Sequence, residues 1–328
     1  MSQITPSTSQ QLATRNDAFM QSLNEALQTP LKSKPYTAYI TRSTPSVFLF
    51  LIDQSGSMKE SVTLNDGRTT TKAAFLADAI NATLNNLLDR CIKGNEIRDY
   101  FDIAIIGYGK DSTQSNMAWE GALSDKTWVK MSELVENYLT EHEETVERNI
   151  RGKTIQNIVK RKKWLNAVAQ NKTPMHHAFT QAAELLEDWI VRYKNKDVYP
   201  PTIINITDGQ YTDATNAQML EAAQRLKGLK TMDGGVLLFN LHISSKGGQS
   251  VIFPHTANEL PAADSYAKIL FDMSSDLPEL YNNDIALLRG TDTMSTFTGM
   301  AYNASLDSLV KLMNIGTSTT TRQIQQPI

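Results

Sequence analysis

Residues Val47 to Ser57 read Val-Phe-Leu-Phe-Leu-Ile-Asp-Gln-Ser-Gly-Ser, and this stretch decides the fold. The first six residues are all apolar, with the Val, Ile and Phe content that is typical of a strand buried on both faces. Asp53, Ser55 and Ser57 follow at once, at the carboxyl end of the predicted strand. Open α/β sheets place their ligand sites at that end. Oxygen groups spaced this closely favour a hard divalent cation such as Mg²⁺.

The composition predicts a sizeable core and no strong global charge. The chain has 328 residues, of which 41% are hydrophobic, and a formal net charge of −3. We therefore expect neither nucleic acid nor a membrane as a partner. A nucleic-acid role would rest on the basic run 160–163 alone, without an aromatic platform or a recognisable reading module. The single cysteine, Cys91, excludes an intrachain disulfide, and its apolar helical surroundings predict a buried thiol.

No apolar run approaches the roughly 20 residues that span a bilayer. Residues 1–15 are rich in Ser, Thr and Gln and lack the apolar stretch of a signal peptide, so we expect a cytoplasmic location. We also expect residues 1–45 to form a partly disordered extension with one short helix over 17–28. The segment 46–315 is predicted to be one domain, followed by a polar tail over 316–328.

Predicted strands alternate with amphipathic helices along the domain. Strands are expected at 47–52, 101–107, 202–206, 236–243 and 268–273, and helices at 72–91, 131–146, 175–193, 213–229 and 305–313, with an irregular strand or hairpin over 119–129. This alternation is typical of βαβ units. The predicted fold class is α/β, with a doubly wound, mainly parallel, Rossmann-like sheet flanked by helices.

An acidic block and a basic block follow each other in the middle of the chain. Glu141, Glu143, Glu144 and Glu147 precede Arg148, Arg151 and the run 160–163. We interpret both blocks as solvated surfaces whose charges neutralise each other. An interaction surface within 131–165 is the alternative.

Two further loops complete a candidate site. Thr173 directly precedes the predicted helix 175–193, and Asp208 directly follows the predicted strand 202–206. In a doubly wound fold these loops converge with the one that carries Asp53, because the carboxyl ends of parallel strands share one edge. Five oxygen ligands, of which only two are charged, leave a bound Mg²⁺ with net positive character. Such an ion attracts a carboxylate from elsewhere.

Together these residues resemble the metal-ion-dependent adhesion site of the von Willebrand factor type A (VWA) family. The resemblance covers about 47–315 and implies that Asp53, Ser55, Ser57, Thr173 and Asp208 bind Mg²⁺, which Mn²⁺ or Ca²⁺ could replace. It further implies that a partner's Asp or Glu fills the free position on the ion. Lys172 departs from the family pattern, in which glycine usually precedes the threonine.

More narrowly, the chain is similar to bacterial VWA proteins of the TerY type. The matching blocks are Asp53-Gln54-Ser55-Gly56-Ser57-Met58, Lys172-Thr173-Pro174-Met175 and Ile206-Thr207-Asp208-Gly209. The shorter matches are Trp189-Ile190, the run 200–205, Asn303-Ala304-Ser305 and Asn314-Ile315-Gly316-Thr317. This likeness implies a protein kinase or phosphatase as the partner, in a stress-response or defence system.

The sequence gives no support to an enzyme. The D-x-D pair of haloacid-dehalogenase-type phosphatases is absent, because position 55 is serine, and the G-x-S-x-G nucleophile pattern is absent too. His176 and His177 are adjacent, so their side chains diverge on a helix and cannot easily share one ion. We therefore predict a metal-dependent protein-interaction module. The alternative is a scaffold that binds through residues 1–45 or 131–165, with a purely structural metal.

Overall fold

The computed structural model describes residues 8–64, 67–150, 153–243, 250–262, 264–291, 296–304, 311–313, 315 and 324. Within these residues, eight strands form the main sheet: β1 (Ser46–Asp53), β6 (Phe101–Tyr108), β7 (Ser115–Met117), β8 (Val129–Lys130), β11 (Thr202–Thr207), β14 (Leu237–Ile243), β15 (Val251–Ile252) and β16 (Met300–Ala304). Their order is β15-β16-β14-β11-β1-β6-β7, and β8 also pairs with β6. The five strands from β16 to β6 are parallel, whereas β15, β7 and β8 pair antiparallel with their neighbours.

Helices and small hairpins complete the described structure. The helices are α1 (Thr8–Gln28), α2 (Lys72–Cys91), α3 (Met131–Glu136), α4 (Met175–Tyr193), α5 (Asn216–Gly228), α6 (Ser265–Met273) and α7 (Asn282–Arg289). The hairpins are β2–β3 (Ser61–Thr63, Thr69–Thr71), β4–β5 (Ile92–Lys93, Glu96–Ile97), β9–β10 (Thr140–Ile150, Lys153–Lys163) and β12–β13 (Lys230–Thr231, Gly234–Gly235). Short 3₁₀ turns lie at Gly56–Lys59, Gly121–Leu123, Ala257–Glu259 and Glu279–Tyr281. No helix in the described ranges combines the length and the apolar character needed to cross a membrane.

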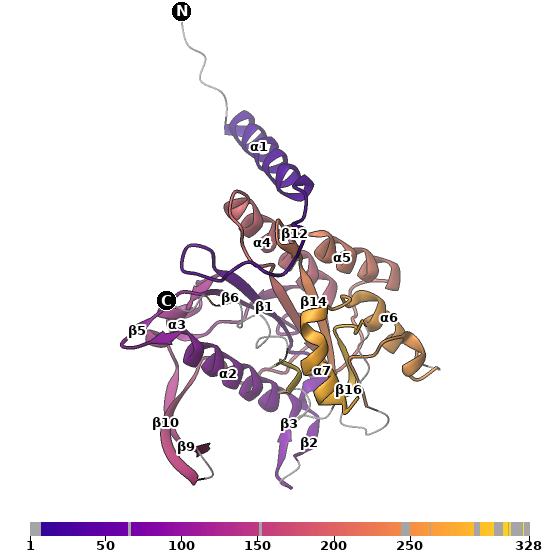
Figure 1. The fold of residues 1–328 in the computed structure, drawn as a ribbon. Coiled ribbons are helices and arrows are strands. Elements are labelled where there is room, and N and C mark those ends of the chain that lie inside the picture. The colour runs from indigo at the N-terminus through magenta and orange to yellow at the C-terminus, as the bar shows by residue number, and fades with distance from the viewer. Residues whose placement is uncertain are drawn as a thin grey trace, which may run out of the picture.

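Strand β1 is the centre of the core, because all eight of its residues are buried. Phe48, Phe50 and Ile52 pack on one face of the sheet with the apolar side of α2. The alternate residues Val47, Leu49 and Leu51 pack on the other face with α4 and α5. Helices therefore cover both faces of a mainly parallel sheet (Figure 1), which confirms the predicted α/β class.

The chain order reverses between β1 and β11. From β1 the chain continues through α2 on one face to β6, while from β11 it continues through α5 on the other face to β14. The loops that follow β1 and β11 therefore turn to opposite faces. Such a switch point leaves a crevice at the carboxyl ends of the two strands, which is where open α/β sheets bind ligands.

Several sequence predictions are confirmed with little change. The helices at 72–91 and 175–193 are α2 and α4, with identical bounds. The strands at 47–52, 101–107, 202–206 and 236–243 are β1, β6, β11 and β14, each shifted by two residues or fewer. Cys91 is buried, and burial raises the pKa of its thiol to about 12. These elements could be predicted because each has a long and regular pattern of apolar residues.

The predicted helix over 131–146 is wrong. Helix α3 ends at Glu136, and the chain continues as the long hairpin β9–β10. Opposite charges face each other across this hairpin: Glu141 contacts Lys160 at 3.0 Å and Lys162 at 2.8 Å. Arg161 likewise pairs with Glu144 at 2.9 Å, so the described residues of the two blocks neutralise each other, as interpreted. Pairing with the adjacent arm of the hairpin outweighed the local helical preference of a Glu-rich stretch.

The predicted strand at 268–273 is also wrong, because it lies within helix α6. Asp264 caps this helix, with its carboxylate accepting from the backbone N–H groups of Tyr266 at 2.9 Å and Ala267 at 3.0 Å. Buried residues then recur at helical spacing, at positions 266, 267, 270 and 273. The apolar run 269–271 is too short to distinguish a strand from a helix, and the helix cap at Asp264 is the feature that decides for the helix.

Other boundaries differ more modestly. Helix α5 begins at Asn216 rather than at 213, because Thr215 and Gln218 form a capping box. Pro174 is the N-cap of α4 rather than its first residue. Between β7 and β8, the segment 118–128 contains a single 3₁₀ turn instead of a strand. Helix α7 and strand β16 were not predicted. Of the predicted helix 305–313, only 311–313 are described, and they are helical.

The N-terminal extension is more ordered than predicted. Helix α1 begins at Thr8, nine residues before the expected start, and its N-terminal end points away from the body (Figure 1). Its last turns pack on the domain through Leu23 and Ala26, which are both buried. Leu12, Ala13 and Arg15 have a high helix propensity, which favours the earlier start.

The connection from α1 to β1 belongs to the packed body. The carboxylate of Asp233, in the β12–β13 turn, accepts from the backbone N–H groups of Thr37 at 2.9 Å and Ala38 at 3.0 Å. Ala38 and Ile40 then enter the core beside α2. Ile40 also pairs with Ile324, the one described residue of the predicted tail 316–328. Residues 37–40 are therefore packed against the strands and helices that follow them.

A row of buried polar side chains crosses the central strands near their carboxyl ends. The hydroxyl of Tyr108 on β6 donates to Oδ1 of Asn205 on β11 at 2.8 Å. Nδ2 of Asn205 donates to Oδ1 of Asn240 on β14 at 2.9 Å, and Nδ2 of Asn240 donates to Oγ of Ser274 at 3.0 Å. Because each buried group needs its partner, this row fixes the register of three strands.

Replacing the middle of this row tests its contribution to stability. We expect Asn205→Leu to lower the free energy of unfolding by about 2–3 kcal/mol, because it leaves buried Oδ1 of Asn240 without its donor. The measurement is urea denaturation. The double variant Asn205→Leu/Asn240→Leu is expected to lose less than the sum of the two single variants. Strictly additive losses would contradict a cooperative row.

Candidate functional site

The crevice between β1 and β11 gathers the residues predicted to bind a cation. Asp53 ends β1, Ser55 and Ser57 lie in the loop that follows, and Asp208 directly follows β11. Strands β1 and β11 are adjacent and parallel, in a register that pairs Ile52 with Ile206. The carboxyl ends of the two strands therefore lie side by side, and the topology brings together residues that are 151–155 positions apart in sequence.

Asp53 is held rigidly at the base of the site. Its side chain is almost fully buried, with the residue 1% exposed. Oδ1 accepts from the backbone N–H of Ser55 at 2.8 Å, and Oδ2 accepts from the hydroxyl of Thr207 at 2.9 Å. Burial raises the pKa of Asp53 to about 6, and the nearby charge of Asp208 adds to this increase.

The two serines connect the first loop to the third. Oγ of Ser55 and Oγ of Ser57 lie 3.0 Å apart, within hydrogen-bond distance. Oγ of Ser57 also donates to Oδ1 of Asp208 at 2.7 Å. Ser57 is exposed, whereas the side chain of Asp208 is fully buried. The oxygens of Ser55, Ser57 and Asp208 thus form one continuous cluster that opens to solvent at Ser57.

Sequence reasoning missed Lys72, which completes this cluster. It is the first residue of α2 and only 4% exposed. Its Nζ lies 2.8 Å from Oδ2 of Asp208 and 2.6 Å from Oε2 of Glu60. Burial alone would lower the pKa of Lys72, but the two carboxylates outweigh it and raise that pKa above its usual value. In the sequence, Lys72 looks like an ordinary helix start.

Thr173 lies on the second loop, which is docked against the first. The backbone N–H of Gly56 donates to the carbonyl of Asn171 at 2.8 Å, and the N–H of Gln170 donates to the carbonyl of Gln54 at 2.8 Å. Thr173 itself is buried, and its N–H donates to Oγ1 of Thr212 at 3.0 Å. Within the described residues, its hydroxyl has no hydrogen bond to the other four predicted ligands. The structure therefore joins four of the five ligands directly and places the fifth on a neighbouring loop.

Gly107 and Gly109 make room for the first loop, although no sequence motif marks them. A Cβ at Gly107 would lie 2.3 Å from the side-chain oxygen of Gln54, and one at Gly109 would lie 2.4 Å from the backbone nitrogen of Ser55. Gly109 also has a φ of +118°, which L-residues rarely adopt. The loop after β6 can therefore approach the Asp53–Ser57 loop only because Gly109 lacks a side chain, since a Cβ there would meet backbone atoms. At Gly107, inside β6, the side chain of Gln54 would have to move.

Aromatic side chains border the third loop. The hydroxyl of Tyr266 on α6 donates to the carbonyl of Gly209 at 2.5 Å. The ring of His242 stacks on Tyr302, with ring centroids 4.8 Å apart. Burial lowers the pKa of His242 to about 4, so this imidazole is neutral at physiological pH. It can neither supply a positive charge to the site nor compete with a metal cation for Asp208.

His176 and His177 lie outside the oxygen cluster. Their backbone N–H groups donate to the carboxylate of Asp213, at 3.2 and 2.9 Å, which caps the start of α4. Nδ1 of His177 accepts from the backbone N–H of Ser115 at 3.1 Å. This arrangement agrees with the interpretation that the two residues start a helix and share no ion.

The donor set fits a hard cation. The cluster offers two carboxylates and the hydroxyls of Ser55, Ser57 and Thr173, with no nitrogen or sulfur ligand, which suits Mg²⁺ or Mn²⁺ better than zinc or copper. Across the described ranges, no group of three or more His, Cys, Asp or Glu side chains is arranged to bind a metal ion.

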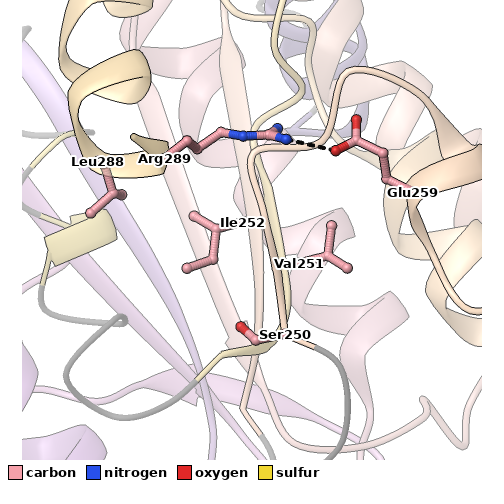
Figure 2. A pocket seen from close by; sticks show the side chains of 6 residues that line it. All are labelled: Ser250, Val251, Ile252, Glu259, Leu288 and Arg289. Carbon is pink, nitrogen blue, oxygen red and sulfur yellow. Dashed lines mark hydrogen bonds and ion pairs between the residues drawn. The ribbon is translucent and has the colours of Figure 1, made fainter. Parts of the chain in front are cut away.

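A separate cavity of about 470 Å³ lies beside β15 and α7. Figure 2 shows that Arg289 and Glu259 pair across it, with 2.7 Å between Nη2 and Oε2. The remaining lining is Ser250, Val251, Ile252 and Leu288. The two charged groups of this cavity, Arg289 and Glu259, therefore already pair with each other.

The pKa of Asp53 predicts how the metal-free protein responds to pH. Its folded-state value of about 6 lies above the ordinary value of 3.8. Asp53 therefore stabilises the fold at low pH, and this contribution is lost as the pH rises through about 6. The difference between the two pKa values corresponds to roughly 3 kcal/mol in the free energy of unfolding between low and high pH. We expect Asp53→Asn to unfold at higher urea concentration than the wild type at pH 8 without divalent metal, with the advantage shrinking toward pH 4. A less stable variant at pH 8 would contradict this.

Gly109 offers a test of loop geometry with a matched control. Gly94 also has a positive φ, of +62°, but a Cβ there would have no neighbour within 4 Å. We expect both alanine variants to lose about 1 kcal/mol through backbone strain. Only Gly109→Ala is expected to lose more than this and to abolish the thermal shift produced by Mg²⁺. Equal behaviour of the two variants would show that the close approach is unimportant.

No protein-family model matches this chain, and no curated protein matches it. Among solved structures, the chain is similar to an uncharacterized membrane spanning protein from Vibrio fischeri, with 16% identity, 70% of this chain and 86% of that chain covered, and a TM-score of 0.21. It is also similar to the pilus adhesin RrgA from Streptococcus pneumoniae, with 16% identity, 55% of this chain and 22% of that chain covered, and a TM-score of 0.25. Such low scores carry no argument about function, which has to come from the geometry of the site.

Proposed function

We propose that this protein is a metal-dependent protein-interaction module of the VWA type. A divalent cation, Mg²⁺ in the first instance, is held by Asp53, Ser55, Ser57, Thr173 and Asp208 and captures an Asp or Glu side chain of a partner protein. The observation that carries the proposal is the continuous oxygen cluster at the switch point. Two buried carboxylates from different loops belong there to one hydrogen-bonded network: Asp208 accepts from the hydroxyl of Ser57, which lies next to that of Ser55, and Asp53 accepts from the backbone N–H of Ser55.

The charges of the cluster favour docking of an anion over a closed structural site. Asp53 and Asp208 together contribute two negative charges, and Lys72 contributes one positive charge. Within the buried group of Asp53, Asp208 and Lys72, a divalent cation leaves one net positive charge, because two positive charges meet one remaining negative charge. The carboxylate of Glu60, which pairs with Lys72 from the solvent side, is 46% exposed and therefore partly screened by water. The exposure of Ser57 gives a ligand from solvent a path to the cation. A carboxylate from a partner is the group that satisfies both conditions.

We infer a non-enzymatic role. The hydroxyls of Ser55 and Ser57 bond to each other and to Asp208 rather than to a histidine, so neither has the partner that activates a serine nucleophile. His242 is neutral and buried, which makes it a poor acid or base at physiological pH. Binding, rather than bond breaking, is what this arrangement supports.

The class of partner rests on the sequence resemblance alone. Similarity to VWA proteins of the TerY type suggests a protein kinase or phosphatase in a bacterial stress-response or defence system. The cytoplasmic location and the absence of nucleic-acid and membrane partners are proposed on the same sequence grounds. We propose that such a partner docks at the carboxyl edge of the sheet, because Ser57, the exposed member of the oxygen cluster, lies there.

A scaffold that binds through its N-terminal arm is the second candidate. Helix α1 points away from the body (Figure 1), and Met20 on it is 51% exposed. The charged segment 131–165 is a weaker alternative, since Glu141 and Glu144 already pair with basic residues of the same hairpin. In both cases the metal would only stabilise the fold.

The proposal predicts that Asp53→Ala abolishes metal-dependent capture. We expect its affinity for Mn²⁺, measured by titration calorimetry, to fall at least about tenfold, because the replacement removes a buried carboxylate from the site. The matched control is Asp125→Ala, which removes an exposed carboxylate elsewhere and should bind Mn²⁺ as the wild type does. Partners are then captured from the native host with each variant, with Mg²⁺ and with a chelator.

A partner retained only by the wild type and Asp125→Ala, and only with Mg²⁺, would support docking through the metal. An identical set of partners under all conditions would contradict it. Deleting residues 1–28 separates the two candidates, because loss of the partner with unchanged Mn²⁺ affinity would favour the scaffold.

A further inference from the structure

Lys72 places a positive charge inside the candidate metal site. Its ammonium group is 4% exposed and lies 2.8 Å from Oδ2 of Asp208. The other oxygen of the same carboxylate accepts from Ser57 at 2.7 Å. Both oxygens of the third-loop aspartate are therefore engaged without any metal. A buried carboxylate without such partners would be costly, so Lys72 compensates the charge of Asp208 and holds its carboxylate in place.

Glu60 shares the same ammonium group from the solvent side. Its Oε2 lies 2.6 Å from Nζ of Lys72, and its side chain is 46% exposed. The hairpin β2–β3 separates the two residues in sequence and returns the chain, so that the N–H of Lys72 donates to the carbonyl of Glu60 at 3.0 Å. The ammonium thus lies between one carboxylate that belongs to the metal site and one that does not.

We propose that Lys72 is an internal counter-cation that determines how tightly the site binds its metal. Without metal it neutralises Asp208 and keeps the site formed. With metal it is a neighbouring positive charge that opposes the divalent cation, and Glu60 moderates this opposition by attracting the ammonium away from Asp208. The inference rests on the proposed function, since it assigns a role toward the metal bound by Asp208.

The internal-cation role and a merely structural role predict opposite changes in metal affinity. If Lys72 only supported the fold, its removal would loosen the site and weaken metal binding. If it acts as a counter-cation, its removal destabilises the metal-free protein but strengthens binding, because a like charge beside the metal is gone. The sign of the change therefore distinguishes the two roles.

The test uses the full chain and Mn²⁺ alone, with binding measured by electron paramagnetic resonance and metal-free stability by thermal unfolding, at pH 8. We expect Lys72→Met to bind Mn²⁺ about tenfold more tightly than the wild type and to unfold at a lower temperature without metal. Glu60→Gln is expected to bind about twofold to threefold more weakly, because the ammonium then belongs to Asp208 alone. Lys126→Met, which removes an exposed lysine from a surface ion pair, is the control and should leave Mn²⁺ affinity unchanged.

Unchanged or weaker binding by Lys72→Met would overturn the inference while leaving metal binding itself in place. If Lys72→Met does not fold, Lys72→Gln and Glu60→Gln must still shift the affinity in opposite directions, and a shift in the same direction would overturn it. Failure of the wild type to bind Mn²⁺ would overturn the proposed function together with this inference.

Discussion

Two carboxylates buried side by side are the constraint around which the site is organised. Asp53 and Asp208 end adjacent parallel strands, and the side chain of Asp208 is fully buried. Like charges in a low-dielectric environment repel and lose their hydration, so each needs compensation. The N–H of Ser55, the hydroxyls of Thr207 and Ser57, and the ammonium of Lys72 supply it. A divalent cation would compensate the same charges more completely, which is why the arrangement favours a metal site.

The topology and a few small residues make this arrangement possible. The order of the strands reverses between β1 and β11, so the loops that carry the two carboxylates open toward opposite faces and leave the crevice between them. Gly109 lets the loop after β6 pack against Ser55, and the second loop is fastened to the first through Gly56 and Asn171. The loops that carry the oxygens are consequently fastened to one another by backbone contacts.

Much of this could be predicted from the sequence, because strong local patterns agreed with the tertiary fold. The buried strand ending in Asp53 and the helices starting at Lys72 and Met175 have clear periodicity, and the four residues Asp53, Ser55, Ser57 and Asp208 do lie together. The hairpin β9–β10 could not be predicted, because its strands are stabilised by each other and not by local preference. Lys72 was missed for a similar reason: only the fold brings Asp208, which lies 136 positions later, to the start of α2.

The most direct test of the central claim is a crystal structure of the protein grown with Mn²⁺, with the metal located by anomalous scattering. The account predicts one strong peak in the crevice between β1 and β11, within about 2.2 Å of Oγ of Ser55 and Oγ of Ser57. The ammonium of Lys72 would remain next to Glu60. A crevice without a peak at saturating Mn²⁺, or a peak bound only by residues outside the oxygen cluster, would contradict the account.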